Sequence, residues 1–188
     1  VALFCYEPAG LAALLDTLAE NPEPTVLLVT AGRSTHAVQR SIEDEITLNP
    51  LRNKRKQLSI SYLSLLSQDD FDHLLWASDL NFVRGEDSLV RALWAGKPFV
   101  WQIYPQDDGA HRAKLRAFLD WLQAPRSLRR VHDVWNGLAD LAPGQLLFTP
   151  PELASWQETF TRARQSLLTQ HDLTDTLQQK FDNENTRW

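Results

Sequence analysis

Short apolar segments alternate with amphipathic segments along the first hundred residues of the chain. The apolar segments are rich in β-branched and aromatic residues, which predicts strands, and those between them repeat apolar residues at helical spacing. The predicted strands cover residues 1–7, 25–32, 58–64, 80–85 and 98–104, and the predicted helices cover 10–20, 33–44, 68–78 and 86–97. Strands that alternate with helices favour right-handed crossovers, so we expect an α/β fold with a parallel sheet and helices on both faces.

Only helical patterns follow the fifth strand. They predict further helices over 110–122, 126–138, 151–170 and 172–183. Residues 42–57 are acidic first and basic afterwards, a pattern typical of a solvated loop.

Composition narrows the class of protein. The chain has 188 residues, 43% of them hydrophobic and 23% charged, as in an ordinary globular domain. Its net charge of -5 argues against a general nucleic-acid binder. There is no signal-peptide pattern and no apolar run near the roughly 20 residues that span a bilayer, so no membrane contact is expected.

Cysteine and methionine counts add two expectations. The single cysteine, Cys5, excludes an internal disulfide and fits a reducing cytoplasm. The chain contains no methionine and starts directly on an apolar segment. This predicts a piece of a longer protein.

Several familiar chemical motifs are absent from the sequence. It has no GxGxxG dinucleotide fingerprint, no P-loop and no GxSxG nucleophile elbow. Its five histidines are not at metal-ligand spacing, and one cysteine cannot complete a zinc site. We therefore expect no metal and no cofactor, and any catalysis is expected to use positioned carboxylates and backbone donors.

The most informative stretch reads NFVRGEDS at residues 81–88. Arg84 ends the fourth predicted strand, Gly85 turns the chain, and the next three residues open a helix. The amides of a first helical turn lack intrahelical acceptors and carry partial positive charge, so they suit a phosphate. Acidic residues and a serine at such a place also cap helices that bind nothing. Because carboxylates repel a phosphate, Glu86 would have to face a sugar hydroxyl or a cationic acceptor.

Aromatic residues lie near the same predicted sheet edge. Tyr104 ends the fifth predicted strand, where its hydroxyl is within expected reach of a phosphate, although a half-buried structural role suits it equally. Phe4 and Tyr6 share one face of the first predicted strand. Either ring is able to stack on a base or to belong to the core.

A longer sequence similarity supports the interpretation of residues 81–88 as part of a ligand site. Residues 4–7 (FCYE), 67–106 and 110–122 closely resemble the EarP family of protein-arginine rhamnosyltransferases, which modify bacterial translation elongation factor P. The chain departs from the family signature at Leu89 and Leu93, where Phe and Gln are expected. The resemblance covers essentially the whole chain but only the C-terminal half of the family's protein.

The resemblance implies a fold and a donor. Family members have a GT-B architecture, in which two Rossmann-like domains face each other across a cleft. Residues 1–188 would then form the Rossmann-like domain that binds dTDP-β-L-rhamnose, with extra C-terminal helices. The N-terminal domain that binds the acceptor would lie outside this chain. An arginine nitrogen of elongation factor P would attack the sugar with inversion, without a metal.

The resemblance also implies site residues. The donor-site positions are Phe4, Tyr6, Gln68, Arg84, Gly85, Glu86, Asp87, Ser88 and Tyr104. Glu86 matches the family's essential glutamate, and Leu65 stands where an aromatic residue of the thymine pocket is expected. The general base would belong to the N-terminal domain.

Two other functions fit the residues without the resemblance. One is a module that binds or senses a nucleotide without transferring anything. The other is a protein-interaction domain that uses an acidic surface and the seven tryptophans. A thermal-shift screen distinguishes the three functions. Selective stabilisation by dTDP would support the transferase, and stabilisation by adenine or guanine nucleotides would favour the sensing module. No stabilisation by any nucleotide would favour the interaction domain.

Overall fold

A computed structural model describes residues 1–48, 57–106, 109–142, 144–170, 174 and 176–178 of the chain. Its centre is a five-stranded, all-parallel sheet in the order β3-β2-β1-β4-β5. The strands are β1 (Ala2–Leu3), β2 (Thr25–Val29), β3 (Leu58–Tyr62), β4 (Asn81–Arg84) and β5 (Phe99–Gln102). The predicted α/β class, with five strands and helices between them, is confirmed.

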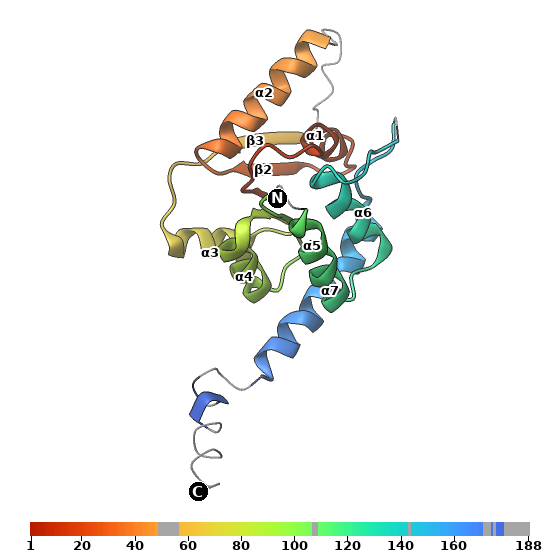
Figure 1. The fold of residues 1–188 in the computed structure, drawn as a ribbon. Coiled ribbons are helices and arrows are strands. Elements are labelled where there is room, and N and C mark those ends of the chain that lie inside the picture. The colour runs from red at the N-terminus through yellow and green to blue at the C-terminus, as the bar shows by residue number, and fades with distance from the viewer. Residues whose placement is uncertain (49–56, 107–108, 143, 171–173, 175, 179–188) are drawn as a thin grey trace, which may run out of the picture.

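The helices form two layers. The first four are α1 (Leu11–Ala19), α2 (Arg33–Leu48), α3 (Gln68–Ala77) and α4 (Gly85–Ala95). The chain runs outward from β1 to β3 and then returns to β4 and β5. Right-handed crossovers in opposite directions place α1 and α2 on one face of the sheet and α3 and α4 on the other. Direct packing of α1 on α2 and of α3 on α4 agrees with this (Figure 1).

The first strand is shorter than predicted. It pairs with both neighbouring strands at Ala2 and Leu3, the Phe4 amide still donates to the Phe82 carbonyl of β4 (2.8 Å), and the chain then leaves the sheet. The Cys5 amide donates to the Ser34 hydroxyl (2.9 Å) and the Tyr6 amide to the Gln102 side-chain oxygen (2.8 Å). Side chains thus replace the missing strand partners and hold this segment above the sheet edge.

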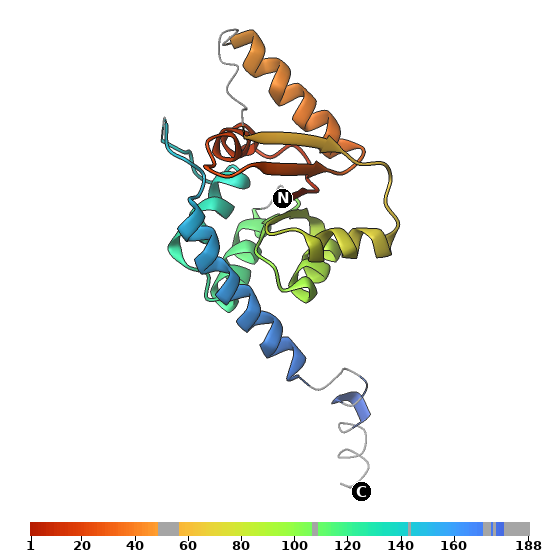
Figure 2. The same ribbon diagram turned by 180° about the vertical axis from the view of Figure 1, so that it is seen from behind.

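Within the described residues, helices α5 (Ala110–Trp121), α6 (Arg126–Trp135) and α7 (Pro150–Leu168) follow the sheet. Helix α7 begins with a capping box between Thr149 and Glu152, and it extends away from the sheet at its C-terminal end (Figures 1 and 2). The predicted final helix over 172–183 falls largely outside the described residues.

Helix α6 closes the open edge of the sheet along β5. The Trp101 amide donates to His132 Nε2 (3.0 Å), and the Ile103 amide donates to Asn136 Oδ1 (3.0 Å). Asn136 Nδ2 donates in turn to the Trp101 carbonyl (2.9 Å). An edge strand leaves backbone groups unpaired, and these two side chains satisfy them.

The prediction of a loop over 42–57 was wrong for its first part. Helix α2 continues to Leu48, because Ile42 still packs against the core and no glycine or proline interrupts residues 42–48. The acidic residues 43–45 lie mostly on its outer side. The rest of the predicted loop, residues 49–56, lies outside the described part of the chain.

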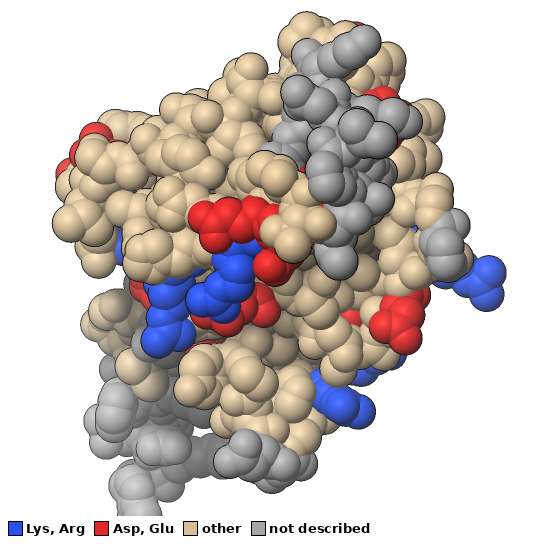
Figure 3. Space-filling model, turned by 90° about the horizontal axis from the view of Figure 1, so that it is seen from above, with Lys and Arg blue, Asp and Glu red and all other residues tan. Residues whose placement is uncertain are grey.

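Large aromatic residues fill the core. Trp101, Trp135 and Trp156 are fully buried, together with Phe82 and Phe99. Three of the seven tryptophans are therefore structural. On the face shown in Figure 3, acidic and basic side chains are interspersed. No helix among the described residues has the length and apolar character needed to cross a membrane.

Candidate functional site

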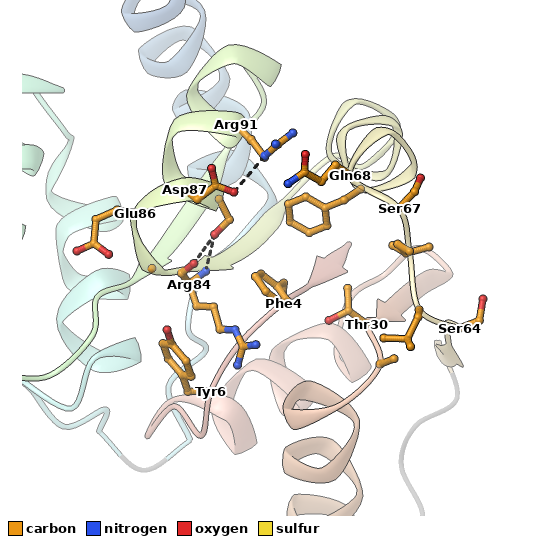
Figure 4. A pocket seen from close by; sticks show the side chains of 16 residues that line it. Phe4, Tyr6, Thr30, Ser64, Ser67, Gln68, Arg84, Glu86, Asp87 and Arg91 are labelled. Atoms are coloured by element: carbon orange, nitrogen blue, oxygen red, sulfur yellow. Dashed lines mark hydrogen bonds and ion pairs between the residues drawn. The ribbon is translucent and has the colours of Figure 1, made fainter.

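A cavity of about 590 Å³ opens beyond the carboxyl ends of β1 and β4. The strand order reverses between these two strands, and open α/β sheets bind ligands at such a point. Phe4 and Tyr6 line it after β1, Gln68 lines it at the start of α3, and residues 84–88 line it at the turn into α4. Tyr104 is not part of the lining. The structure therefore brings eight of the nine predicted donor-site residues together (Figure 4).

The turn into α4 is held by a serine. Gly85 has φ +67°, in the left-handed region that favours glycine, and a Cβ there would lie 3.5 Å from the Tyr6 hydroxyl. The buried Ser88 hydroxyl accepts from the Arg84 amide (3.1 Å) and donates to the Arg84 carbonyl. Ser88 thus fixes the turn, which leaves the first amides of α4 without intrahelical acceptors beside the cavity.

Arg84 lies between two aromatic rings. Its guanidinium carbon is 4.3 Å from the centre of the Phe4 ring and 4.4 Å from that of Tyr6. Its Nη1 donates to the Cys5 carbonyl (3.2 Å). Burial lowers its pKa from the ordinary value, an effect that the nearby Tyr6 partly offsets, but a guanidinium stays charged. The rings hold a cation, pre-oriented by stacking, at the cavity wall.

Tyr104 follows β5 outside the cavity. Its ring is 58% exposed and meets the Tyr6 ring edge-on, with 5.9 Å between centroids. In this structure Tyr104 therefore supports Tyr6, and the expected contact of its hydroxyl with a phosphate stays a prediction.

Glu86 has a partner that the sequence did not indicate. Lys114 of α5 donates to Glu86 Oε1 over 2.7 Å, and both side chains are about half exposed. This hydrogen bond lowers the pKa of Glu86 from its ordinary value, against a smaller opposing effect of burial. In Figure 4 the Glu86 carboxylate points away from Phe4 and Gln68. The pairing joins positions 28 residues apart on two different helices, so no local sequence pattern reveals it.

Asp87 belongs to a second ion-pair network. Arg91, one turn further along α4, contacts Asp87 with Nε (3.2 Å) and both oxygens of Asp72 with Nη1 (3.0 and 2.8 Å). These hydrogen bonds raise the pKa of Arg91. The network ties α3 to α4 across one wall of the cavity. Sequence reasoning missed Arg91 and Asp72, although the spacing of Asp87 and Arg91 is that of a helical ion pair.

Another part of the cavity lining is less polar. Leu65, at the expected aromatic position, lines the cavity but is 90% exposed. Phe71 of α3 also lines it and meets Phe4 edge-on at 5.3 Å. The cavity thus has an aromatic corner that the sequence analysis did not name. Among the described residues no group of three or more His, Cys, Asp or Glu is arranged to hold a metal.

The chain matches the family model "Elongation-Factor P (EF-P) rhamnosyltransferase EarP" over residues 1–182. It is 47% identical over 120 residues to a protein-arginine rhamnosyltransferase of Pseudomonas putida, covering 63% of this chain and 32% of that protein. For the protein of the same name from Pseudomonas aeruginosa the identity is 40% over 152 residues, with 76% and 39% covered. The chain thus spans well under half the length of these curated relatives.

A solved structure agrees with the sequence matches. It is described as "Structural basis for EarP-mediated arginine glycosylation of translation elongation factor EF-P" and matches with a TM-score of 0.71 at 33% identity. The match covers 97% of this chain and 59% of that one. The sequence signature, the parallel sheet and the family match together show that this chain belongs to the EarP family of rhamnosyltransferases.

Proposed function

We propose that this chain is the donor-binding part of an inverting glycosyltransferase. The complete protein would move rhamnose from dTDP-β-L-rhamnose to an arginine of translation elongation factor P. The observation that carries the proposal is the cavity at the strand reversal, where Arg84 and the first turn of α4 meet. Family membership supports the reaction class and the acceptor, and the GT-B architecture follows from the same resemblance.

The diphosphate would bind at the turn into α4. The amides of that turn and Arg84 offer hydrogen bonds to an anion. As the bond between the anomeric carbon and the phosphate oxygen breaks, negative charge develops on the leaving dTDP. Donors that are already oriented stabilise that charge without reorganising. The thymidine end would extend toward the wall formed by Phe71 and Leu65.

The acceptor needs groups beyond this site. An arginine guanidinium is protonated and therefore a poor nucleophile. A carboxylate must orient it, and a base must take the proton that nitrogen loses when it bonds to the anomeric carbon. Glu86 lies next to the anion-binding turn and suits the orienting role toward the sugar or the acceptor. The family resemblance assigns the base to the N-terminal domain.

Calorimetry with the purified 188-residue chain tests the donor site. We expect heat of binding with dTDP and dTDP-rhamnose and little with ADP or GDP. A preference for purine nucleotides would support a sensing module, and no nucleotide binding at all would contradict the donor-site assignment.

A transfer assay tests the division of labour. The chain is incubated with dTDP-rhamnose and elongation factor P, and intact mass is read for one added deoxyhexose. We expect no transfer by the chain alone and transfer by a protein that includes the N-terminal domain, because positioning alone accounts for about 7–11 kcal/mol of a barrier. Comparable rates for the two would place the base within these residues.

A further inference from the structure

The first turn of α4 carries two carboxylates beside the proposed diphosphate site. Left unpaired, both would repel a phosphate. In the structure each carboxylate has a cation: Glu86 is bound by Lys114 (2.7 Å) and Asp87 by Arg91 (3.2 Å). The charge of Glu86 is therefore balanced before any ligand binds, whereas Asp87 shares Arg91 with Asp72. Arg84 contributes a further positive charge to the cavity wall.

The two cations are held differently. Arg91 donates from Nη1 to both carboxylate oxygens of Asp72, and it also donates from Nε to Asp87. Lys114, by contrast, binds Glu86 and no second carboxylate among the described residues. The position of the Lys114 side chain therefore depends on Glu86, whereas Asp72 would still hold Arg91 without Asp87.

A buried tryptophan of β5 holds the turn into α4 in place. Trp101 is 1% exposed, and its indole Nε1 donates to the Gly85 carbonyl over 2.8 Å. Lys114 Nζ lies 5.9 Å from the centre of the Trp101 ring. Trp101 thus fixes the backbone of the turn, while Lys114 holds the neighbouring Glu86 side chain.

We propose that Lys114 is a positioning residue of the donor site. It holds the Glu86 carboxylate away from the cavity and cancels its charge, so that the amides of α4 can accept a diphosphate. The inference rests on the proposed function, because it requires an anionic ligand at this turn. When an acceptor or sugar binds, the ionised Glu86 carboxylate exchanges Lys114 for that ligand.

A double-mutant cycle separates this role from direct binding of the phosphate by Lys114. The affinity for dTDP is measured by calorimetry for the wild type, Lys114→Met, Glu86→Gln and the double variant. Methionine keeps the length of the side chain and removes its charge. We expect Lys114→Met to weaken binding about three- to tenfold, the scale of one uncompensated charge near a half-exposed site. In the Glu86→Gln background the same change should alter the affinity less than about twofold.

Two matched variants control for other effects. Arg116 lies on the same helix, is similarly exposed and pairs with Asp133 (3.4 Å), so Arg116→Met removes one positive charge and one ion pair away from the turn. It should leave dTDP affinity within about twofold of wild type. Lys114→Arg retains the charge and should retain most of the affinity.

An equal loss from Lys114→Met in both backgrounds would show direct phosphate contact and overturn the proposal, as would no loss in either. A second readout does not depend on the ligand. The Glu86 carboxyl group is titrated by ¹³C NMR in the free chain, where Asp87 is the adjacent acidic group. Lys114→Met should raise the Glu86 pKa, and an unchanged value would contradict the pairing. If the wild type binds no dTDP, the proposed function fails and takes the donor-site role of Lys114 with it, while the titration still decides the pairing.

Discussion

Two polar regions hold the carboxyl ends of β4 and β5 in opposite ways. At the cavity rim, the turn into α4 uses ionised side chains that are partly exposed: Glu86 with Lys114, and Asp87 with Arg91. At the sheet edge, His132 and Asn136 are neutral groups that bind β5 backbone atoms, and His132 is fully buried. Pairs that water reaches can exchange partners at small cost. Groups buried away from water cannot, because a lost hydrogen bond there is not replaced by one to water.

This difference divides function from stability. Changes at the rim should alter binding and catalysis while the chain stays folded. Changes at the sheet edge should alter folding before they alter the site. Each prediction below would weaken or refine that division.

The largest effect is expected from Glu86→Gln in a protein that includes the N-terminal domain. The change keeps the size of the side chain and removes its charge, so the guanidinium or sugar loses its orienting carboxylate. Rhamnose transfer should fall by at least about 100-fold, since small misplacements at a reacting centre cost this much. Affinity for dTDP should stay within about tenfold, or 1.4 kcal/mol. Steady-state kinetics and calorimetry measure both, and unchanged turnover would remove Glu86 from the mechanism.

Arg84→Ala should act on binding instead. Removing the guanidinium takes one charge-assisted hydrogen bond from the diphosphate and should weaken dTDP binding by about 1.5–3 kcal/mol. The change also removes the guanidinium that packs between the Phe4 and Tyr6 rings, so circular dichroism is used to check that the variant is folded. Wild-type affinity in a folded Arg84→Ala chain would refute the phosphate role of this residue.

The sheet edge should show a pH dependence of stability. Burial lowers the pKa of His132 to about 4 from an ordinary 6.5. Between these values the unfolded chain binds the proton and the folded chain does not, so stability falls as pH falls. The slope approaches about 1.4 kcal/mol per pH unit below pH 6, which gives roughly 1.5 kcal/mol between pH 6.5 and 5.

Urea unfolding at several pH values measures this slope. In His132→Gln the slope over that window should be lost, together with part of the stability at pH 7. His36 is exposed, so His36→Asn should keep the slope of the wild type. A wild-type chain whose stability does not change from pH 6.5 to 5 would mean that His132 is not buried as a neutral group.

The sequence predicted the fold well because its evidence was local. Each strand is a short apolar run, and each helix has its own periodicity, as in Leu11–Ala19. The ends of elements were less accurate where distant side chains decide them. The sheet pairing of the first strand ends after the Phe4 amide, because Ser34 and Gln102 bind the amides of Cys5 and Tyr6. No pattern within residues 1–7 contains that information.

The candidate site was predictable to a similar degree. Residues 84–88 were found because the turn, the glycine and the charges are adjacent in sequence. Lys114 and Asp72 were missed because their partners come from other helices. Phe4 and Tyr6 line the cavity beside residues 84–88, but their contact with Arg84 depends on how the chain leaves the sheet after Phe4.

The smallest effect is expected at Tyr104, which separates a supporting role from a ligand contact. Its ring packs edge-on against Tyr6 and lies mostly in solvent. If it supports Tyr6, Tyr104→Phe should leave dTDP affinity within about twofold, because the ring pair is kept. Tyr104→Ala removes a contact worth about 0.5–1.5 kcal/mol, and with the ring this exposed we expect the low end, a loss of about two- to threefold. If the hydroxyl instead reaches the phosphate when dTDP binds, Phe should lose as much affinity as Ala. Equal losses of affinity in the two variants would therefore show that Tyr104 contacts the ligand, and Tyr104 would then belong to the donor site rather than to the residues that support it.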